Sequence, residues 1–264
     1  MNKIDQKTVY TIKALCADMI QKANSGHPGL PLGAAGFTHV LWSQVLNHSA
    51  KHPEWVNRDR FILSAGHGSS MLYSLLHLYG YGLTMDDLKQ FRQLGSLTPG
   101  HPEYGHTVGV DATTGPLGQG LGMAVGMAMG QAHLATVFNK PGYDLFDHYV
   151  YALAGDGCMM EGISSEALSL AGTLKLEKLI ILYDSNNISI EGNTNITFTE
   201  NVSDRVKAFG FETLTVKDGD NLDEVLAALE KAKTIKGKPK FIEIKTTIGK
   251  DSPNEGSEST HGAP

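Results

Sequence analysis

Residues 148–175 read HYVYALAGDGCMMEGISSEALSLAGTLK, and this stretch decides the class of fold. The run HYVYAL is typical of a buried strand, and the run ISSEALSLAGTLK is typical of a helix. Asp156 stands on the corner between them, with Gly155 before it and Gly157 after it. A helix N-cap would explain this acid, because aspartate is a favoured capping residue and glycine suits a tight turn. The competing interpretation is that the carboxylate binds a ligand.

The alternation of strand and helix extends beyond this stretch. Short apolar or β-branched runs predict strands at 60–63, 179–184, 212–216 and 240–245. Helical patterns are found at 163–174, about 201–208 and 222–234. We therefore expect an α/β fold, a parallel sheet with helices on both faces, and the length suits one large domain or two small ones. Ligands of such sheets bind beyond the carboxyl ends of the strands, where Asp156 lies.

Composition restricts the functional classes. The formal net charge of -6 and the lack of a Lys- or Arg-rich run do not indicate a nucleic-acid partner. Two cysteines without a CxxC spacing favour a reducing, cytoplasmic location, and the N-terminal residues lack the apolar core of a signal peptide. The most membrane-like stretch is 121–138. Because Gln131 and His133 interrupt it and nothing flanks it like an anchor, we expect a buried helix and no membrane association.

Glycines are unusually frequent around residue 120. The loop GPLGQGLG (115–122) opens a helix, and the backbone N–H groups of such a helix start favour an anion, typically a phosphate. Four glycines then recur every four residues, at positions 118, 122, 126 and 130. Each interior glycine costs a helix roughly 1 kcal/mol relative to alanine. The stripe indicates either tight helix packing within the core or the close approach of another backbone or a ligand.

Four histidines stand beside glycine in loop-like settings: His27 in SGHPG, His67 in AGHGS, His101 in PGHPE and His261 in THGAP. Glycine lets a ligand approach the backbone next to a polar ring, so these four are candidate site residues. A zinc site is the competing explanation. It is disfavoured because the sequence has neither HExxH nor a Cys/His pair at zinc-ligand spacing.

A second polar position follows the next predicted strand. Asn186 lies 30 positions after Asp156, which fits one strand–helix–strand excursion. If the two strands are neighbours, both side chains project into one crevice. Carboxylate and amide oxygens suit Mg²⁺, which often takes few protein ligands together with phosphate oxygens and water. The pair therefore predicts a metal that holds a diphosphate.

The order of these motifs resembles the transketolase family. The string GDG, followed about thirty positions later by Asn186 and Asn187, is similar to the cofactor motif of thiamin-dependent enzymes. The segments that carry the closer resemblance are, in order, SGHPG, FILSAGHGSSMLYSLLHLYGY, TPGHPE, TTGPLGQGL, GDGCMMEGISSEALSLAGTLKL and THGAP. The resemblance implies a thiamin-diphosphate-binding fold, in a single domain over residues 1–264, with thiamin diphosphate and Mg²⁺ as cofactors. At Lys250 and Asp251 the sequence departs from the family pattern, which more often has an aromatic and a small residue there.

The resemblance also implies roles for single residues. The implied Mg²⁺ ligands are Asp156, Asn186 and the backbone carbonyl of Ile188. The implied cofactor contacts are His67, Gly115, Leu117, Gly157, Asn186 and His261. The implied catalytic residues, which face the sugar hydroxyls and the reacting carbon, are His27, His101 and the shared His261. Neutral histidines suit such proton transfers.

The activity implied is the transfer of a two-carbon ketol unit from a ketose phosphate to an aldose phosphate, a reaction of the pentose phosphate pathway. The resemblance assigns these residues to the diphosphate half of the site. The expected partner is a C-terminal transketolase chain or domain that carries the pyrimidine-binding part, in a homodimer or heterotetramer. We accordingly expect the isolated chain to be inactive. The alternatives are a non-catalytic thiamin-diphosphate-binding or scaffold protein, or part of another thiamin enzyme such as dihydroxyacetone synthase or deoxyxylulose-phosphate synthase.

Overall fold

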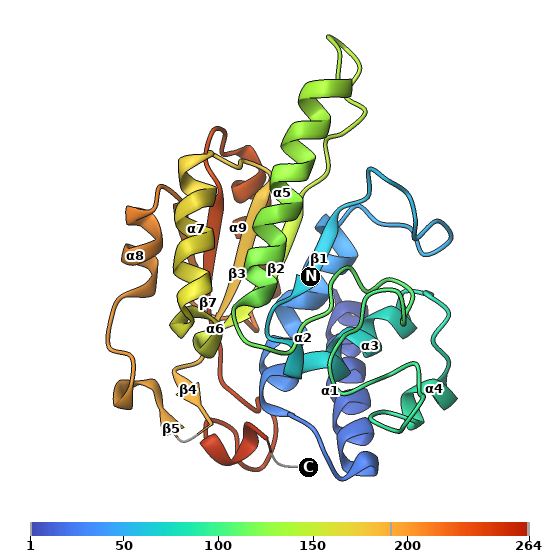
Figure 1. The fold of residues 1–264 in the computed structure, drawn as a ribbon. Helices are drawn as coiled ribbons and strands as arrows, with labels where there is room; N and C mark the ends of the chain where they lie inside the picture. Colours follow the sequence, from blue (N-terminus) through green and yellow to red (C-terminus); the bar gives the residue numbers. More distant parts are fainter. Residues whose placement is uncertain (1, 191, 263–264) are drawn as a thin grey trace.

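The computed structural model describes residues 2–190 and 192–262. Its centre is a five-stranded parallel sheet in the order β1-β2-β3-β7-β6 (Figure 1). The strands are β1 (Arg60–Leu63), β2 (Val150–Gly155), β3 (Leu179–Ser185), β7 (Lys240–Lys245) and β6 (Glu212–Val216). Every residue of β2 and β3 is buried, which explains their unbroken apolar runs. The predicted α/β class and parallel sheet are confirmed.

Helices cover both faces of the sheet. On one face α5 (Gln119–Phe138) and α7 (Gly162–Thr173) lie side by side, and on the other lie α9 (Leu222–Thr234) and α2 (Gly29–Val40) (Figure 1). Helices α1 (Lys3–Ala23), α3 (Ser69–Leu78) and α4 (Met85–Lys89) gather beside the β1 edge. In the described residues the other α-helices and strands are the short helices α6 (Asp156–Met160) and α8 (Val202–Ala208) and the antiparallel pair β4 (Ile188–Ser189) and β5 (Gly192–Asn193). This layering leaves the carboxyl ends of β2 and β3 open for a site.

Helix α5 is not the buried helix that its composition suggested. Only 28% of its most apolar window is buried, and the methionines Met123 and Met129 are exposed on its outer face. A Cβ on Gly118 would lie 2.7 Å from Ser164 Oγ of α7, whereas Gly126 and Gly130 face open space. Core packing therefore explains only the start of the glycine stripe. By length and composition alone α5 could also cross a membrane, but its inner face packs on the sheet.

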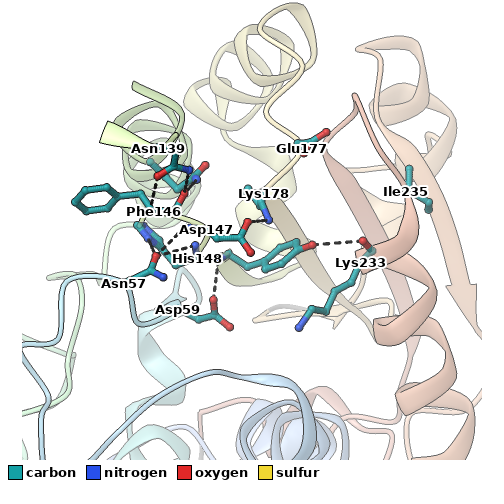
Figure 2. Close-up of polar contacts among 12 residues, drawn as sticks. Asn57, Asp59, Asn139, Phe146, Asp147, His148, Glu177, Lys178, Lys233 and Ile235 are labelled. Atoms are coloured by element: carbon teal, nitrogen blue, oxygen red, sulfur yellow. Dashed lines mark hydrogen bonds and ion pairs between the residues drawn. The ribbon is translucent and has the colours of Figure 1, made fainter. Parts of the chain in front are cut away.

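At the amino ends of the strands, polar groups bind one another (Figure 2). The Asp59 carboxylate accepts a hydrogen bond from the Tyr149 backbone N–H at 2.6 Å, and the Tyr149 hydroxyl donates to the Lys233 carbonyl at 3.3 Å. Lys178 forms an ion pair with Asp147 beside the same ring. This network lies at the amino ends of the strands, and the candidate site lies at their carboxyl ends.

Candidate functional site

The register of β2 and β3 brings the two candidate metal ligands together. The strands are neighbours, and Gly155 pairs with Asp184 across them. Asp156 follows the first of these residues directly, and Asn186 follows the second by two positions. Because the strands are parallel, both side chains emerge at the same edge of the sheet. The predicted convergence of Asp156 and Asn186 is confirmed.

Asp156 is the first residue of α6, and the N-cap position belongs to Gly155. The capping interpretation is therefore wrong. Instead, one carboxylate oxygen accepts from the Tyr183 hydroxyl, and the other accepts from the Asn187 backbone N–H at 3.0 Å. Only 4% of Asp156 is exposed, and this burial raises the pKa of its carboxyl above the usual value. The orientation of the Asp156 carboxylate is thus fixed by two hydrogen-bond donors.

Asn186 is held in a similar way. Its Nδ2 donates to Asp184 Oδ2 at 2.8 Å, and its Oδ1 accepts from the Ile188 backbone N–H at 2.9 Å. Asn187, which lies between Asn186 and Ile188 in the chain, adopts a left-handed backbone conformation with a φ of 61°. Asparagine tolerates this conformation better than most residues, which explains the second Asn of the motif. The tight turn brings Ile188 back to the same edge of the sheet.

A cavity of about 490 Å³ opens at this edge. Every residue that the sequence assigned to the site lines it: His27, His67, His101, Gly115, Leu117, Asp156, Gly157, Asn186, Ile188 and His261. They come from seven separate segments of the chain, so only the fold assembles them. Lys250 and Asp251, the departures from the family pattern, lie outside this lining and contact Glu255 and Lys13.

Three of the four histidines form a triangle. The ring centroids lie 5.2 Å apart for His27 and His67, 5.7 Å for His27 and His261, and 5.3 Å for His67 and His261. Burial, reinforced by neighbouring positive charge, lowers the pKa of His27 to about 4 and that of His67 to about 3. Burial also lowers the pKa of His101 and that of His261. All four rings are therefore neutral at pH 7.

Arg92 decides which nitrogen of His27 carries the proton. Its guanidinium Nη2 lies 3.3 Å from His27 Nδ1. Because a guanidinium can only donate, Nδ1 accepts, and the neutral ring has its proton on Nε2. His27 thus offers one N–H donor. Sequence reasoning did not single out Arg92, since nothing in the run around it marks a site.

The loop before α5 forms part of the cavity wall. Gly115, at the cavity wall, has a φ of 153°, and a Cβ there would lie 3.3 Å from the His101 ring. Gly118 is the N-cap of α5 with a φ of 78°, and no side chain caps this helix start. Gly115 and Leu117 of this loop line the cavity, whereas the first residues of α5 do not. The Gln119 N–H at the start of α5 donates to the Pro116 carbonyl at 3.4 Å.

The donor set at Asp156 fits magnesium. The part of the chain described by the structure contains no group of three His, Cys, Asp or Glu side chains placed to bind a metal. The candidate ligands are instead a carboxylate, an amide oxygen and a backbone carbonyl. Such hard oxygen ligands suit Mg²⁺, which completes its shell with phosphate and water.

Several lining residues were missed at the sequence level. Apolar side chains of Leu30, Ile196 and Ile248 form part of the wall, and Glu161 and Asp184 also line it. The two acids had a detectable signal, because Glu161 belongs to the GDGCMMEG corner and Asp184 precedes Asn186 by two positions. The apolar residues had none, because their patterns are the same as those of core positions.

Comparisons with known proteins agree with this geometry. The family model described as transketolase, thiamine diphosphate binding domain, matches residues 4–264. A transketolase of Geobacillus stearothermophilus is 57% identical over 100% of this chain and 40% of its own length, and one of Streptococcus pyogenes is 60% identical over 99% and 36%. A transketolase structure from Leishmania mexicana superimposes with a TM-score of 0.98 at 54% identity, covering 100% of this chain and 39% of that one. A Pichia stipitis transketolase in complex with sedoheptulose 7-phosphate gives 0.98 at 48% identity, with coverages of 100% and 39%. The chain spans about 40% of the length of the relatives it matches.

Proposed function

This chain belongs to the transketolase family, and we propose that it binds thiamin diphosphate through Mg²⁺ and contributes this half of the site to a ketol-transferring enzyme. One observation carries the proposal. The carboxylate of Asp156, the amide of Asn186 and the four glycine-flanked histidines converge on a single cavity of about 490 Å³. The thiamine diphosphate-binding domain of the family model covers all of these residues.

The residues divide into two groups by chemistry. Asp156, Asn186 and the carbonyl of Ile188 would hold Mg²⁺, while the backbone at Gly115 and Gly157 reaches the diphosphate. Thiamin diphosphate, when bound, supplies the chemistry that breaks and forms carbon–carbon bonds. His67, Leu117 and His261 would orient the cofactor. His27 and His101, both neutral, would donate to or accept protons from sugar hydroxyls.

The substrates proposed are sugar phosphates, a ketose donor and an aldose acceptor. The Pichia stipitis relative was seen with sedoheptulose 7-phosphate, which belongs to this class. Because the chain spans about 40% of its relatives, we propose that a C-terminal transketolase part completes the site with the pyrimidine-binding half. The 264 residues alone should then bind the cofactor weakly and turn over no substrate. We further propose a cytoplasmic role in the pentose phosphate pathway.

The exposed face of α5 supports assembly. Its outer side carries Met123, Gly126, Met129 and Gly130, and its sequence has no charged residue from Gln119 to Phe138. A solvated helix normally presents charged or polar residues on its outer face. We propose that this face packs against a second subunit, as a homodimer or heterotetramer requires. Sedimentation over a concentration series tests the proposal, and a strict monomer at every concentration would contradict it.

Calorimetry tests cofactor binding. Thiamin diphosphate should bind to the purified chain in the presence of Mg²⁺ and lose most of its affinity when the ion is chelated. Ketol transfer should appear only when the C-terminal part is added. If thiamin diphosphate bound with the same affinity in the presence and absence of Mg²⁺, the proposed metal site would be refuted. Binding with no turnover in the completed assembly would instead favour a non-catalytic binding protein.

A further inference from the structure

Two successive residues at the end of β3 each form a hydrogen bond with one of the two side chains proposed to bind the metal. Neighbouring residues of a strand point to opposite faces of the sheet. The Tyr183 hydroxyl donates to Asp156, and Asp184 accepts from the Asn186 amide. The two ligands are therefore supported from opposite sides by one strand. Tyr183 supports a carboxylate, whose two terminal atoms are chemically equivalent. Asp184 supports an amide, whose two terminal atoms are not.

Asp184 is placed firmly. It is fully buried, at 0% exposure. Its Oδ1 accepts from the hydroxyl of Thr246, which directly follows β7, and its Oδ2 accepts from Asn186 Nδ2 at 2.8 Å. Burying a carboxylate costs free energy even when it is hydrogen-bonded, and an apolar residue would cost less. Stability therefore does not account for a carboxyl group at this position, whereas its hydrogen bond to Asn186 gives it a role at the site.

That effect is on the orientation of the amide. An asparagine side chain can rotate so that either its oxygen or its NH₂ group faces a given direction. In the structure both carboxyl oxygens of Asp184 act as acceptors, Oδ1 from the Thr246 hydroxyl and Oδ2 from Asn186 Nδ2. Asp184 therefore attracts the NH₂ group of Asn186 and leaves Oδ1 on the side of the Ile188 N–H and the cavity. A cation needs the oxygen there, because the NH₂ group would repel it.

We propose that Asp184, itself oriented by Thr246, is a positioning residue that keeps the amide oxygen of Asn186 directed to Mg²⁺. The inference rests on the proposed function, because it concerns the same metal site. Hydrogen-bond partners of metal ligands typically change metal affinity by about 10–100-fold when they are removed. Asp184 and Thr246 should therefore matter for the metal although neither touches it.

The test is a set of variants of the full chain, titrated with Mg²⁺ by calorimetry at a fixed concentration of thiamin diphosphate. Asp184→Leu should weaken Mg²⁺ binding by about 10–100-fold. Adding Asn186→Asp to this variant should restore most of the affinity, because a carboxylate presents an oxygen in either orientation. Thr246→Val should cause a smaller loss, and Thr215→Val, an exposed threonine of β6, serves as the matched control.

Rescue by Asn186→Asp separates positioning from a general structural role, since a damaged fold would not be repaired by it. Unchanged Mg²⁺ affinity in Asp184→Leu, or no rescue in the double variant, would overturn the inference and leave the proposed function intact. Failure of the unchanged chain to bind Mg²⁺ would overturn the proposed function and this inference with it. If circular dichroism shows that Asp184→Leu does not fold, Thr246→Val decides, and an affinity equal to that of Thr215→Val would contradict the proposal.

Discussion

The amino ends and the carboxyl ends of the strands, here called the amino edge and the carboxyl edge of the sheet, both carry buried polar residues. At the first these residues bind only one another and the backbone, and at the second they line a cavity. At the amino edge, Asp59 accepts from the backbone N–H groups of Asn47 and Tyr149, and Lys240 donates to the Glu177 carbonyl. At the carboxyl edge, Asp156 and Asn186 are held from behind and line a cavity of about 490 Å³. The difference shows that a buried carboxylate is not by itself a sign of a site. What distinguishes Asp156 is the space in front of it.

The largest effect is expected from Asp156→Ala. This change should abolish Mg²⁺-dependent binding of thiamin diphosphate, because it removes the only carboxylate among the proposed ligands. The fold should stay intact, but the free energy of unfolding should fall by about 1–3 kcal/mol, because the Tyr183 hydroxyl and the Asn187 N–H lose their acceptor. Calorimetry with and without Mg²⁺ measures the first effect, and a melting curve measures the second. If Asp156→Ala bound thiamin diphosphate with unchanged affinity, Asp156 would be a structural acid like Asp59, and the two edges would not differ in function.

The next effect concerns His27→Ala and His101→Ala in an enzyme completed by its C-terminal part. Both should lower the turnover number by about 100-fold or more, the usual contribution of a group that transfers protons. The affinity for thiamin diphosphate should change far less, because neither residue belongs to the metal pair. Steady-state kinetics and calorimetry on the same preparations compare the two quantities. A loss of cofactor affinity as large as that in Asp156→Ala would show that the residues of the carboxyl edge are not divided into a cofactor-binding group and a substrate-facing group.

Asp59→Ala tests the amino edge. Two backbone N–H groups would lose their acceptor, which should lower the free energy of unfolding by about 2–4 kcal/mol. Cofactor affinity should stay within about twofold of the unchanged chain, because Asp59 lies at the far end of the strands. Urea denaturation and calorimetry check the two expectations. If Asp59→Ala instead abolished cofactor binding while the melting temperature stayed the same, the roles given to the edges would be reversed.

The smallest effect is the pH dependence of stability. Burial lowers the pKa of His27 from 6.5 to about 4 in the folded chain, so between these values the unfolded chain binds more protons. His27 therefore leaves stability intact above pH 6.5 and reduces it as the pH falls toward 4. Urea denaturation at pH 7 and pH 5 should show a smaller difference for His27→Gln than for the unchanged chain. The neutral His148 of the amino edge contributes in the same direction, so His148→Gln is the matched comparison. An unaltered difference in His27→Gln would argue against a neutral ring at this position.

Much of the fold could be predicted because the apolar pattern is strongly periodic. The structure reproduces the predicted bounds at 212–216, 222–234 and 240–245 without change. The prediction for residues 121–138 was wrong on the outer face of α5, since an apolar pattern cannot show whether its partner lies within the same chain. The ten assigned site residues were all found on one cavity, while the capping interpretation of Asp156 was wrong.

The sequence alone determined which residue types are present and how far apart they lie along the chain. From the strand–helix–strand spacing of Asp156 and Asn186, and from the glycines around the histidines, both the sheet and the chemistry of the site could be inferred. Only the tertiary structure decided which atoms face the cavity. Whether Asp156 caps a helix or points into space, and which atom of the Asn186 amide faces Asp184, depends on contacts with Tyr183, Asp184 and Thr246. Spacing along a chain does not specify these directions, because they follow from the packing of strands that are distant in sequence.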